Sequence, residues 1–425
     1  MKQRLGNFIV IALVLLTAAV WLVFPPVNDE RENFGRVYAG EVLGSILIVL
    51  MSCSLLLAAR PKWAEGFFGG LDKMYAAHRR ISTGAFLLMF IHLLTVPIAT
   101  VNLRLGNYLA MVSFLGILAI ILPTLAPRIP FLNKLTGTTY EGWKKLHRFV
   151  GVFFILGFVH ALTVNGLNAL VAISWTQVFF IIGAASYLYA ELFGRFFRKY
   201  ALYAVEAANR LNASVVEVTL RAQKDPIPKR RAGQFLFVRF PQDKALNESH
   251  PFTISSAPSE DTLRLTIKAS GDFTRHLFQR LQAGMDAVVE GAYGLFDYKT
   301  GGEKQIWVAG GIGVTPFLSF IRDMDGTLSR DVDFYYTVRH REEAVFLDEI
   351  EAAARNIPRL KVHLRFSSVG GSLTAEEIIQ NAGGDLGKHH IYLCGPLPMI
   401  QAFEKKFLAA GAASANIHYE EFNFR

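Results

Sequence analysis

Apolar and polar segments alternate at long intervals over the first half of the chain. A helix needs about 20 apolar residues to cross the hydrocarbon core of a bilayer. Runs of near this length cover residues 8 to 24, 37 to 59, 78 to 98, 107 to 126, 145 to 165 and 173 to 197. The pattern predicts six transmembrane helices. The first is a retained anchor or, in the alternative interpretation, a removed signal peptide.

After residue 199 apolar and polar positions alternate one by one, as is typical of β-strands. The segments VVEVTL, GQFLFVRF and LRLTIKAS predict an antiparallel barrel or sandwich. From about residue 301, the strand-like segments QIWVAG, VDFYYTV, KVHLRFS and HIYLCG alternate with the helix-like segments TPFLSFIRDM and LDEIEAAARN. This alternation is typical of a parallel α/β domain. We therefore expect three domains, at residues 1–199, 200–300 and 301–425.

Positive charge marks alternate loops between the predicted membrane helices. The chain has 44 Lys and Arg against 35 Asp and Glu, a net charge of +9. The basic clusters flank apolar runs at residues 2–4, 60–80, 128–148 and 195–199. Because positive loops remain in the cytoplasm, we expect a multi-pass protein of the plasma (cytoplasmic) membrane with both termini in the cytoplasm. The same placement of charge argues against a nucleic-acid partner.

Four of the eleven histidines fall on two predicted membrane helices: His78 and His92 on the third, His147 and His160 on the fifth. Polar groups at membrane depth are costly and usually functional. At about 1.5 Å rise per residue, the spacings of fourteen and thirteen residues correspond to roughly 21 and 20 Å. His78 is therefore expected to pair with His147 near the cytoplasmic side and His92 with His160 near the outer side. Each pair could hold one haem iron.

The helical phase of the fifth helix is less favourable for this arrangement. Thirteen residues miss the same helix face by about 140° in a straight helix, so either overwinding near Gly151 or Gly157 or different side-chain reaches must close the gap. Alternative interpretations are histidines that hydrogen-bond between helices, or that carry protons in a transporter. Two histidines per iron leave no open metal position, which suits electron transfer. Two cysteines are too few for a thiolate metal site.

Two segments of the soluble half are candidates for binding a flat cofactor. HPFTISSAP (250–258) brings a ring, a rigid proline, an aromatic side chain and hydroxyls together at a strand. In IKASGDFTRHLFQRL, Gly271 permits close approach of the backbone and Thr274 is the expected N-cap of a helix. The free N–H groups of such a helix start can hold a pyrophosphate. A simple capped turn is the alternative.

VAGGIGVTPFLSF (308–320) follows a predicted strand and opens a helix. Its glycines and Pro316 predict a phosphate-binding turn, although the third glycine of the Rossmann fingerprint is missing. A structural tight turn is the alternative. In YYTVRHR, Thr337, Arg339 and Arg341 follow a strand without an acidic residue, which favours NADPH over NADH.

These residues together resemble the NADPH oxidase and ferric reductase superfamily, most closely its compact bacterial NADPH oxidases. The histidine spacings, HPFTISSAP, IKASGDFT, GAYG, AGGIGVTPF and CGPLP carry the resemblance over nearly the whole chain. It implies a six-helix transmembrane haem-binding bundle followed by a ferredoxin-reductase-like module. That module would combine an antiparallel β-barrel FAD domain with an α/β NADPH-binding domain.

The resemblance also implies residue roles. Contacts with FAD would come from His250, Pro251, Phe252, Thr253, Ile267, Lys268, Gly271 and Thr274. Contacts with NADPH would come from Gly310, Gly311, Gly313, Thr315, Pro316, Thr337, Arg339, Cys394, Gly395 and Pro396. A C-terminal aromatic ring would cover the flavin as the catalytic residue, and we expect Phe422 rather than Phe424 in this place. His250 stands where the wider superfamily has an arginine for the FAD pyrophosphate, so looser FAD binding is expected.

The activity implied is electron transfer from cytosolic NADPH through FAD and two b-type haems to molecular oxygen on the opposite side, with superoxide as product. A ferric or other metal-chelate reductase of the same architecture is the alternative, and a membrane anchor that docks a reductase is another. The sequence contains no EF-hand loop, SH3-ligand run or long regulatory insertion. We therefore expect constitutive activity with no obligatory protein partner.

Overall fold

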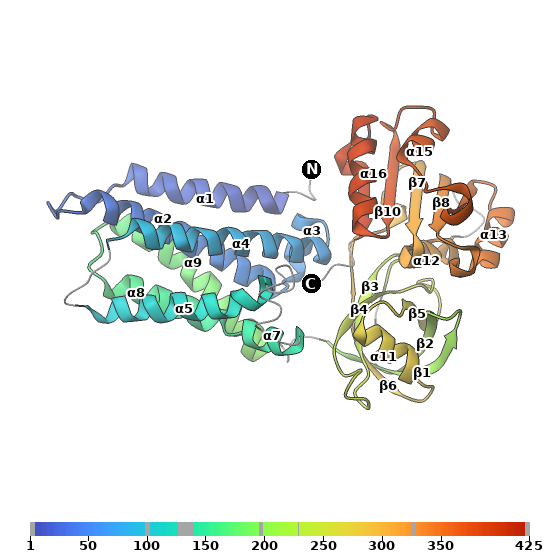
Figure 1. Ribbon diagram of the computed structural model, residues 1–425, viewed down its shortest axis with the longest axis horizontal. Coiled ribbons are helices and arrows are strands. Elements are labelled where there is room, and N and C mark those ends of the chain that lie inside the picture. Colours follow the sequence, from blue (N-terminus) through green and yellow to red (C-terminus); the bar gives the residue numbers. More distant parts are fainter. Residues whose placement is uncertain are drawn as a thin grey trace. The chain divides into compact units, whose positions relative to one another are not determined.

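The computed structural model describes residues 5–97, 103–125, 140–194, 199–227, 229–324 and 329–420. The chain divides into a helical unit of residues 2–69 and 73–197 and a second unit formed mainly by residues 198–425. Figure 1 shows helices alone in the first unit and two sheets with their covering helices in the second.

The helical unit is a bundle of long apolar helices. Its elements are α1 (Leu5–Val23), α2 (Phe34–Ala58), α3 (Lys62–Phe68), α4 (Leu71–Thr95), α5 (Leu105–Leu125), α7 (Tyr140–His147), α8 (Val150–Thr163), α9 (Leu170–Leu188) and the π-helical turn η3 (Tyr189–Phe193). α5 packs along α8, and α2 packs along α9 (Figure 1). α4 contacts α2, because Nδ1 of His78 lies 3.0 Å from the carbonyl oxygen of Ser54 and Nδ1 of His92 lies 3.0 Å from that of Gly40.

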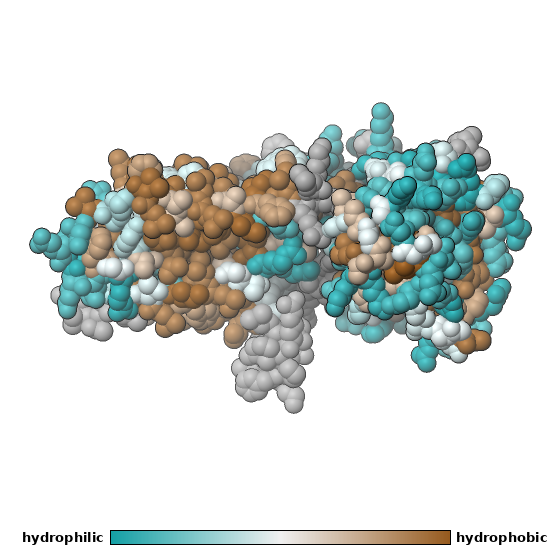
Figure 2. Space-filling view, turned by 90° about the horizontal axis from the view of Figure 1, so that it is seen from above, coloured by the Kyte–Doolittle hydropathy of each residue, from teal (hydrophilic) through white to brown (hydrophobic). Residues whose placement is uncertain are grey.

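Among the described residues, five helical stretches are long and apolar enough to cross a membrane: Leu5–Val23, Phe34–Ala58, Leu105–Thr124, Gly142–Thr163 and Leu170–Phe193. Between 17% and 33% of each stretch is buried inside the protein, and apolar side chains cover the visible face of this unit (Figure 2). Apolar surface of this extent on the outside of a bundle is typical of contact with lipid. The one expected membrane helix outside this set is the third, which corresponds to α4. This helix forms, but it carries Asp72, Lys73, Arg79 and Arg80 in its first half.

The expected distortion of the fifth membrane helix is present, but at a different place. α7 ends at His147, residues 148 and 149 form a turn, and α8 begins at Val150. Because this turn separates the two helices, His147 and His160 need not share one helical phase. Gly151 serves instead for close packing, since a Cβ atom there would lie 2.3 Å from the ring of Tyr187 on α9.

An antiparallel barrel forms the first half of the second unit. It consists of β1 (Ala201–Arg210), β2 (Val215–Lys224), β3 (Phe235–Arg239), β4 (His250–Thr253), β5 (Thr262–Lys268), α11 (Asp272–Arg280) and β6 (Asp286–Tyr293). The strand order is β4-β3-β6-β1-β2-β5. A bridge between Ile254 and Leu265 joins the two outer strands and closes the barrel. The three predicted strand segments are confirmed as β2, β3 and β5.

A parallel sheet with helices forms the second half. Its strands are β7 (Lys304–Gly310), β8 (Asp331–Val338), β9 (Leu360–Phe366), β10 (His389–Cys394) and β11 (Ile417–Glu420), in the order β11-β10-β7-β8-β9. Its helices are α12 (Thr315–Asp323), α13 (Leu347–Asn356), α14 (Ser367–Gly370), α15 (Ala375–Asn381) and α16 (Leu397–Ala409), with the short turns η4 (Tyr298–Thr300), η5 (Gly311–Val314), η6 (Arg341–Glu343) and η7 (Ser414–Asn416). The predicted parallel α/β pattern is confirmed.

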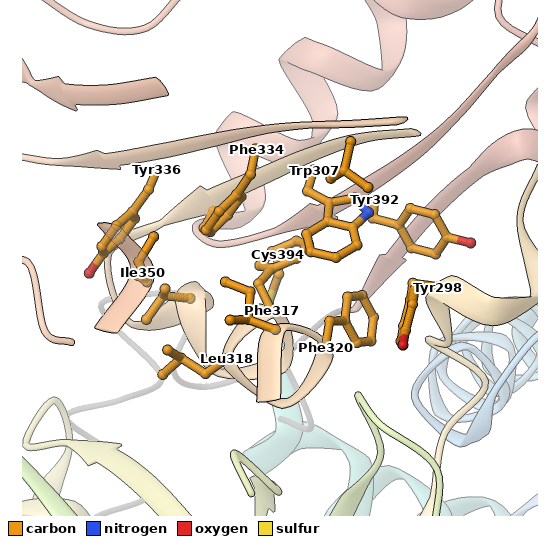
Figure 3. Packing of buried hydrophobic residues seen from close by; sticks show 14 of the residues in the cluster. Tyr298, Trp307, Phe317, Leu318, Phe320, Phe334, Tyr336, Ile350, Tyr392 and Cys394 are labelled. Carbon is orange, nitrogen blue, oxygen red and sulfur yellow. The ribbon is translucent and has the colours of Figure 1, made fainter. Parts of the chain in front are cut away.

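Aromatic side chains fill the space between this sheet and α12. Trp307 on β7 lies between Phe317 and Phe320 of the helix, with ring centroids 5.7 and 5.1 Å away (Figure 3). Phe334 and Tyr392 extend the same cluster onto β8 and β10. This packing fixes α12, and with it the turn that precedes α12, against the carboxyl end of β7.

Candidate functional site

The parallel sheet has its switch point between β7 and β10. The chain runs from β7 outward to β8 and β9, then returns to β10 on the other side of β7. In open α/β sheets, ligands bind outside the carboxyl ends of the strands at this point. Gly310 ends β7 and Cys394 ends β10, so the structure brings the two predicted nicotinamide motifs together there.

The glycines of the first motif allow its turn to touch the second. A Cβ atom on Gly313 would lie 2.3 Å from the carbonyl oxygen of Cys394 and 2.8 Å from the nitrogen of Gly395. A Cβ atom on Gly310 would lie 2.9 Å from Cδ of Pro396. Only glycine permits this approach of two backbones. The glycine turn is therefore built for close packing as well as for a phosphate.

The helix after this turn begins as predicted. Thr315 is the first residue of α12, and its hydroxyl donates to the carbonyl of Ile312 at 3.2 Å. Pro316 occupies the first turn of the helix, where its missing N–H group costs nothing. The backbone N–H of Thr315 already donates to the carbonyl of Ile312, so the expected anion site at this helix start stays a prediction for the turn before it.

The flavin motif of the barrel reaches the same region. The Thr253 hydroxyl, at the end of β4, donates to Oε2 of Glu420 at 3.3 Å. Both residues are buried, and Glu420 pairs in register with Cys394 on the neighbouring strand. Burial raises the pKa of the Cys394 thiol well above its ordinary value, so the sulfur stays protonated. Glu420 was not among the expected site residues. The only sequence feature that could have indicated it is the acidic pair in YEEF.

The second flavin motif forms the predicted helix start with a different cap. Gly271 is the N-cap of α11, and Thr274 is the third residue of the helix, so the expected role of Thr274 as N-cap is wrong. Its hydroxyl accepts from the N–H groups of Ser270 and Gly271, both at 2.9 Å. Thr274 thus stabilises the loop before the helix. The N–H groups of the first turn of α11 remain the expected phosphate donors.

The other predicted flavin residues divide between surface and core. On β4, His250, Pro251 and Phe252 are half-buried, and the His250 ring stacks on Phe273 with centroids 3.7 Å apart. The Ile267 side chain belongs to the barrel core. Only its backbone is therefore available to a cofactor.

Lys268 lies on the nucleotide side of the barrel. It lines a small pocket together with Gly311, Ile312 and Glu343, and its Nζ is 3.9 Å from Oε2 of Glu343. This position favours contact with a nicotinamide nucleotide over contact with the flavin.

The proposed 2′-phosphate residues follow the end of β8. Thr337 is half-buried on the strand, and Arg339 and Arg341 are exposed after it. The Arg341 guanidinium lies 5.7 Å from the ring centroid of Phe366. The Arg339 carbonyl accepts from the N–H of Ser368 at 3.0 Å, and the Arg339 side chain is exposed. Phe422 and Phe424 lie outside the described residues.

In the helical unit, three of the four histidines are oriented by backbone carbonyls. Nδ1 of His78 lies 3.0 Å from Ser54 O and 2.9 Å from Ser54 Oγ, Nδ1 of His92 donates to Gly40 O at 3.0 Å, and Nδ1 of His160 donates to Gly106 O at 2.9 Å. A carbonyl can only accept, so in His92 and His160 the proton is on Nδ1 and Nε2 keeps its lone pair. This arrangement is typical of metal-binding histidines.

The fourth histidine completes the inner pair. The ring centroids of His78 and His147 are 6.4 Å apart, with the ring planes at 85°. A metal–imidazole bond of about 2 Å on each side, plus the ring radii, would separate two axial imidazoles by a similar distance. The buried Nδ1 of His147 has no hydrogen-bond partner in the described chain. The geometry of His78 and His147 therefore fits one bis-histidine metal site, and the pairing of His92 with His160 stays a prediction.

Comparison with known proteins identifies the second unit. Residues 202–304 match the model of an FAD-binding domain, and residues 307–405 match the model of an oxidoreductase NAD-binding domain. The chain also resembles a solved flavohemoglobin from Malassezia yamatoensis in fold. That likeness has a TM-score of 0.53 at 18% identity and covers 92% of this chain and 98% of the flavohemoglobin.

Two curated relatives extend this result. The carnitine monooxygenase reductase subunit of Escherichia coli is 28% identical over 46% of this chain and 60% of its own length. The ferredoxin reductase component of the 3-ketosteroid-9-alpha-monooxygenase of Mycolicibacterium smegmatis is 30% identical over 45% of this chain and 55% of its own. The chain thus spans little more than half the length of these relatives.

These relatives correct one expectation. They are reductase subunits or components, each named for the monooxygenase of which it is a part. The prediction that no protein partner is required is therefore wrong. What the matches establish is an FAD-binding domain at residues 202–304, followed by an oxidoreductase NAD-binding domain at residues 307–405.

Proposed function

We propose that this oxidoreductase spans the cytoplasmic membrane and moves electrons from cytosolic NADPH, through FAD and two b-type haems, to molecular oxygen outside, forming superoxide. The observation that carries the proposal is the set of four histidines. Three have Nδ1 within 3.0 Å of a backbone carbonyl oxygen, and the fourth stands 6.4 Å from the ring of His78. They share one chain with an FAD- and NAD-binding module.

The groups, when bound, supply hydride acceptance at the flavin and single-electron transfer at the irons. The chain's own residues would orient these groups and exclude water from them. Thr253 and Glu420 lie beside Cys394 at the switch point and shape the place where flavin and nicotinamide would meet. His78 with His147, and His92 with His160, would each hold one haem iron, and an iron held by two histidines suits single-electron transfer. Basic residues near the inner ends of the helices favour cytoplasmic termini.

A second candidate function follows from the relatives. Because they are components of monooxygenases, this chain would deliver its electrons to a protein partner, such as an oxygenase component. A third candidate is a ferric or other metal-chelate reductase, in which the acceptor outside the membrane would be a metal chelate in place of oxygen.

The deciding experiment supplies NADPH and FAD to the purified full-length protein and follows cytochrome c reduction with and without superoxide dismutase. We expect the dismutase to abolish most of the reduction. Reduction that is insensitive to the dismutase, or that requires an added protein, would favour the other candidates.

The Gly271→Ala variant tests the FAD phosphate site. In the structure nothing lies within 4 Å of a Cβ atom at this position. We expect the variant to fold with a loss of at most about 1 kcal/mol from the changed N-cap, whereas FAD affinity falls about tenfold because phosphate must approach the backbone closely. Flavin fluorescence titration measures the affinity, and thermal unfolding without FAD provides the control. Unchanged affinity would contradict this site.

The Arg339→Ala variant tests the preference for NADPH. A hydrogen bond to a charged group contributes about 1.5–3 kcal/mol, so we expect the KM for NADPH to rise about tenfold or more while the KM for NADH stays constant. The matched control is Arg355→Ala, an exposed arginine on α13 of the same domain. Equal changes for both nucleotides would show that Arg339 does not read the 2′-phosphate.

A further inference from the structure

Arg322 is a buried charge on the helix that follows the glycine turn. It lies near the end of α12, and its side chain is only 6% exposed. A guanidinium cannot be neutralised at this depth, so partners must satisfy it. Its partners come from both halves of the second unit.

Within the nucleotide-binding half, Arg322 is fixed by α13. Its Nε donates to Oε1 of Glu349 at 2.6 Å and its Nη2 to Oε2 at 2.7 Å. This two-fold contact determines the plane of the guanidinium. The ring of Phe346 lies 4.9 Å from its Cζ and covers one face.

The remaining nitrogen reaches the flavin-binding barrel. Nη1 of Arg322 donates to the carbonyl of Ser255 at 2.8 Å. On the same helix, the Ser319 hydroxyl donates to the carbonyl of Ser256 at 2.9 Å. Ser255 and Ser256 follow Thr253 by two and three residues. Two side chains of α12 therefore hold the backbone that continues from the flavin motif.

A carboxylate of the barrel also lies beside Arg322, where the nucleotide-binding half contacts the barrel. Oε1 of Glu217 on β2 lies 3.6 Å from Nη1 of Arg322 and 3.8 Å from Nη1 of Arg264. This oxygen is buried without a hydrogen-bond partner in the described chain. Burial raises the pKa of Glu217, while the two guanidinium groups oppose that shift. The position of Arg322 thus suits charge attraction across the junction.

The two ends of α12 therefore adjoin the expected sites of two different ligands, the nicotinamide nucleotide and FAD. Its first turn adjoins the glycine turn for the nucleotide, and its last turn holds the segment that carries Thr253. Hydride transfer is sensitive to displacements of about 1 Å. A rigid helix between both sites would fix their separation.

We propose that Arg322 is a positioning residue for hydride transfer, which sets the distance between flavin and nicotinamide through Ser255 and Glu349. The inference rests on the proposed transfer from NADPH to FAD. Arg322 is not among the residues expected to contact FAD or NADPH. Its effect therefore belongs to the rate of transfer more than to the binding of either ligand.

The test measures anaerobic flavin reduction by NADPH in the full-length, FAD-loaded protein by stopped flow. Arg322→Lys keeps the positive charge but loses the planar guanidinium that contacts both oxygens of Glu349. For this variant we expect the limiting rate constant to fall about 10- to 100-fold, with the apparent Kd for NADPH changed less than about threefold. Glu349→Gln keeps the bond to Ser255 and should lower the rate less. Arg359→Lys is the matched control, because Arg359 pairs with Asp331 while 53% exposed.

A rate constant in Arg322→Lys within twofold of the unmodified protein would overturn the inference, even if the melting temperature falls, since that pattern describes a purely stabilising residue. If Arg322→Lys fails to fold, Glu349→Gln decides, and an unchanged rate in it overturns the proposal. Absence of flavin reduction in the unmodified protein would instead contradict the proposed function.

Discussion

Replacing His92 or His160 by leucine should remove one of two haems and abolish electron transfer to outer acceptors. Each residue would supply one axial nitrogen, and leucine offers no ligand. The carbonyls of Gly40 and Gly106, which now accept from these imidazoles, would lose their partners. Flavin reduction by NADPH should remain, because FAD and nucleotide binding belong to the other unit.

The haem-to-protein ratio should fall from two to one in either variant, and superoxide formation should fall at least 100-fold. Haem extraction and cytochrome c reduction measure the two quantities. His276→Leu is the control, since His276 is exposed on α11. Retention of both haems together with normal superoxide formation in the His92 or His160 variant would exclude the outer pair as a haem site.

Replacing Gly313 by alanine should disrupt the nucleotide site. Its Cβ atom would lie 2.3 Å from the Cys394 oxygen and 2.5 Å from the Cys394 carbonyl carbon. Both atoms are backbone, so no change of side-chain rotamer relieves the contact, and one of the two loops must move. Overpacking of this kind costs about 1–3 kcal/mol. We expect NADPH-dependent flavin reduction to fall at least 100-fold through misplacement of the loops.

FAD should still bind to the Gly313→Ala variant, because the barrel has its own core. Flavin fluorescence and stopped-flow reduction separate the two effects. Gly66→Ala is the matched control: Gly66 on α3 has nothing within 4 Å of its would-be Cβ. Normal reduction in the Gly313 variant would show that the contact between the two loops is not required.

The strands and α12 were predictable from local patterns. Alternation in VVEVTL and continuous burial in QIWVAG each specify a strand of the kind observed, because side-chain period follows burial on one or both faces. The Gly-rich turn and Pro316 predict where α12 begins. The outer boundaries of these elements depend on packing, which a single segment does not encode.

Features that depend on residues far apart in the sequence were not predicted. The break at residues 148 and 149 contains neither glycine nor proline, so the sequence offers no local signal for it. Thr274 has the chemistry of an N-cap, yet its hydroxyl accepts from N–H groups before the helix. Glu420 contacts Thr253 across 167 positions. The expectation of no obligatory protein partner failed because the absence of regulatory motifs carries no information about docking.

The most direct test of the account is the haem content of the purified full-length protein, together with its reduced-minus-oxidised spectrum. Four histidines in two pairs predict two low-spin b-type haems per chain, both reducible by NADPH when FAD is present. A protein that folds and binds FAD but contains no haem would contradict the account.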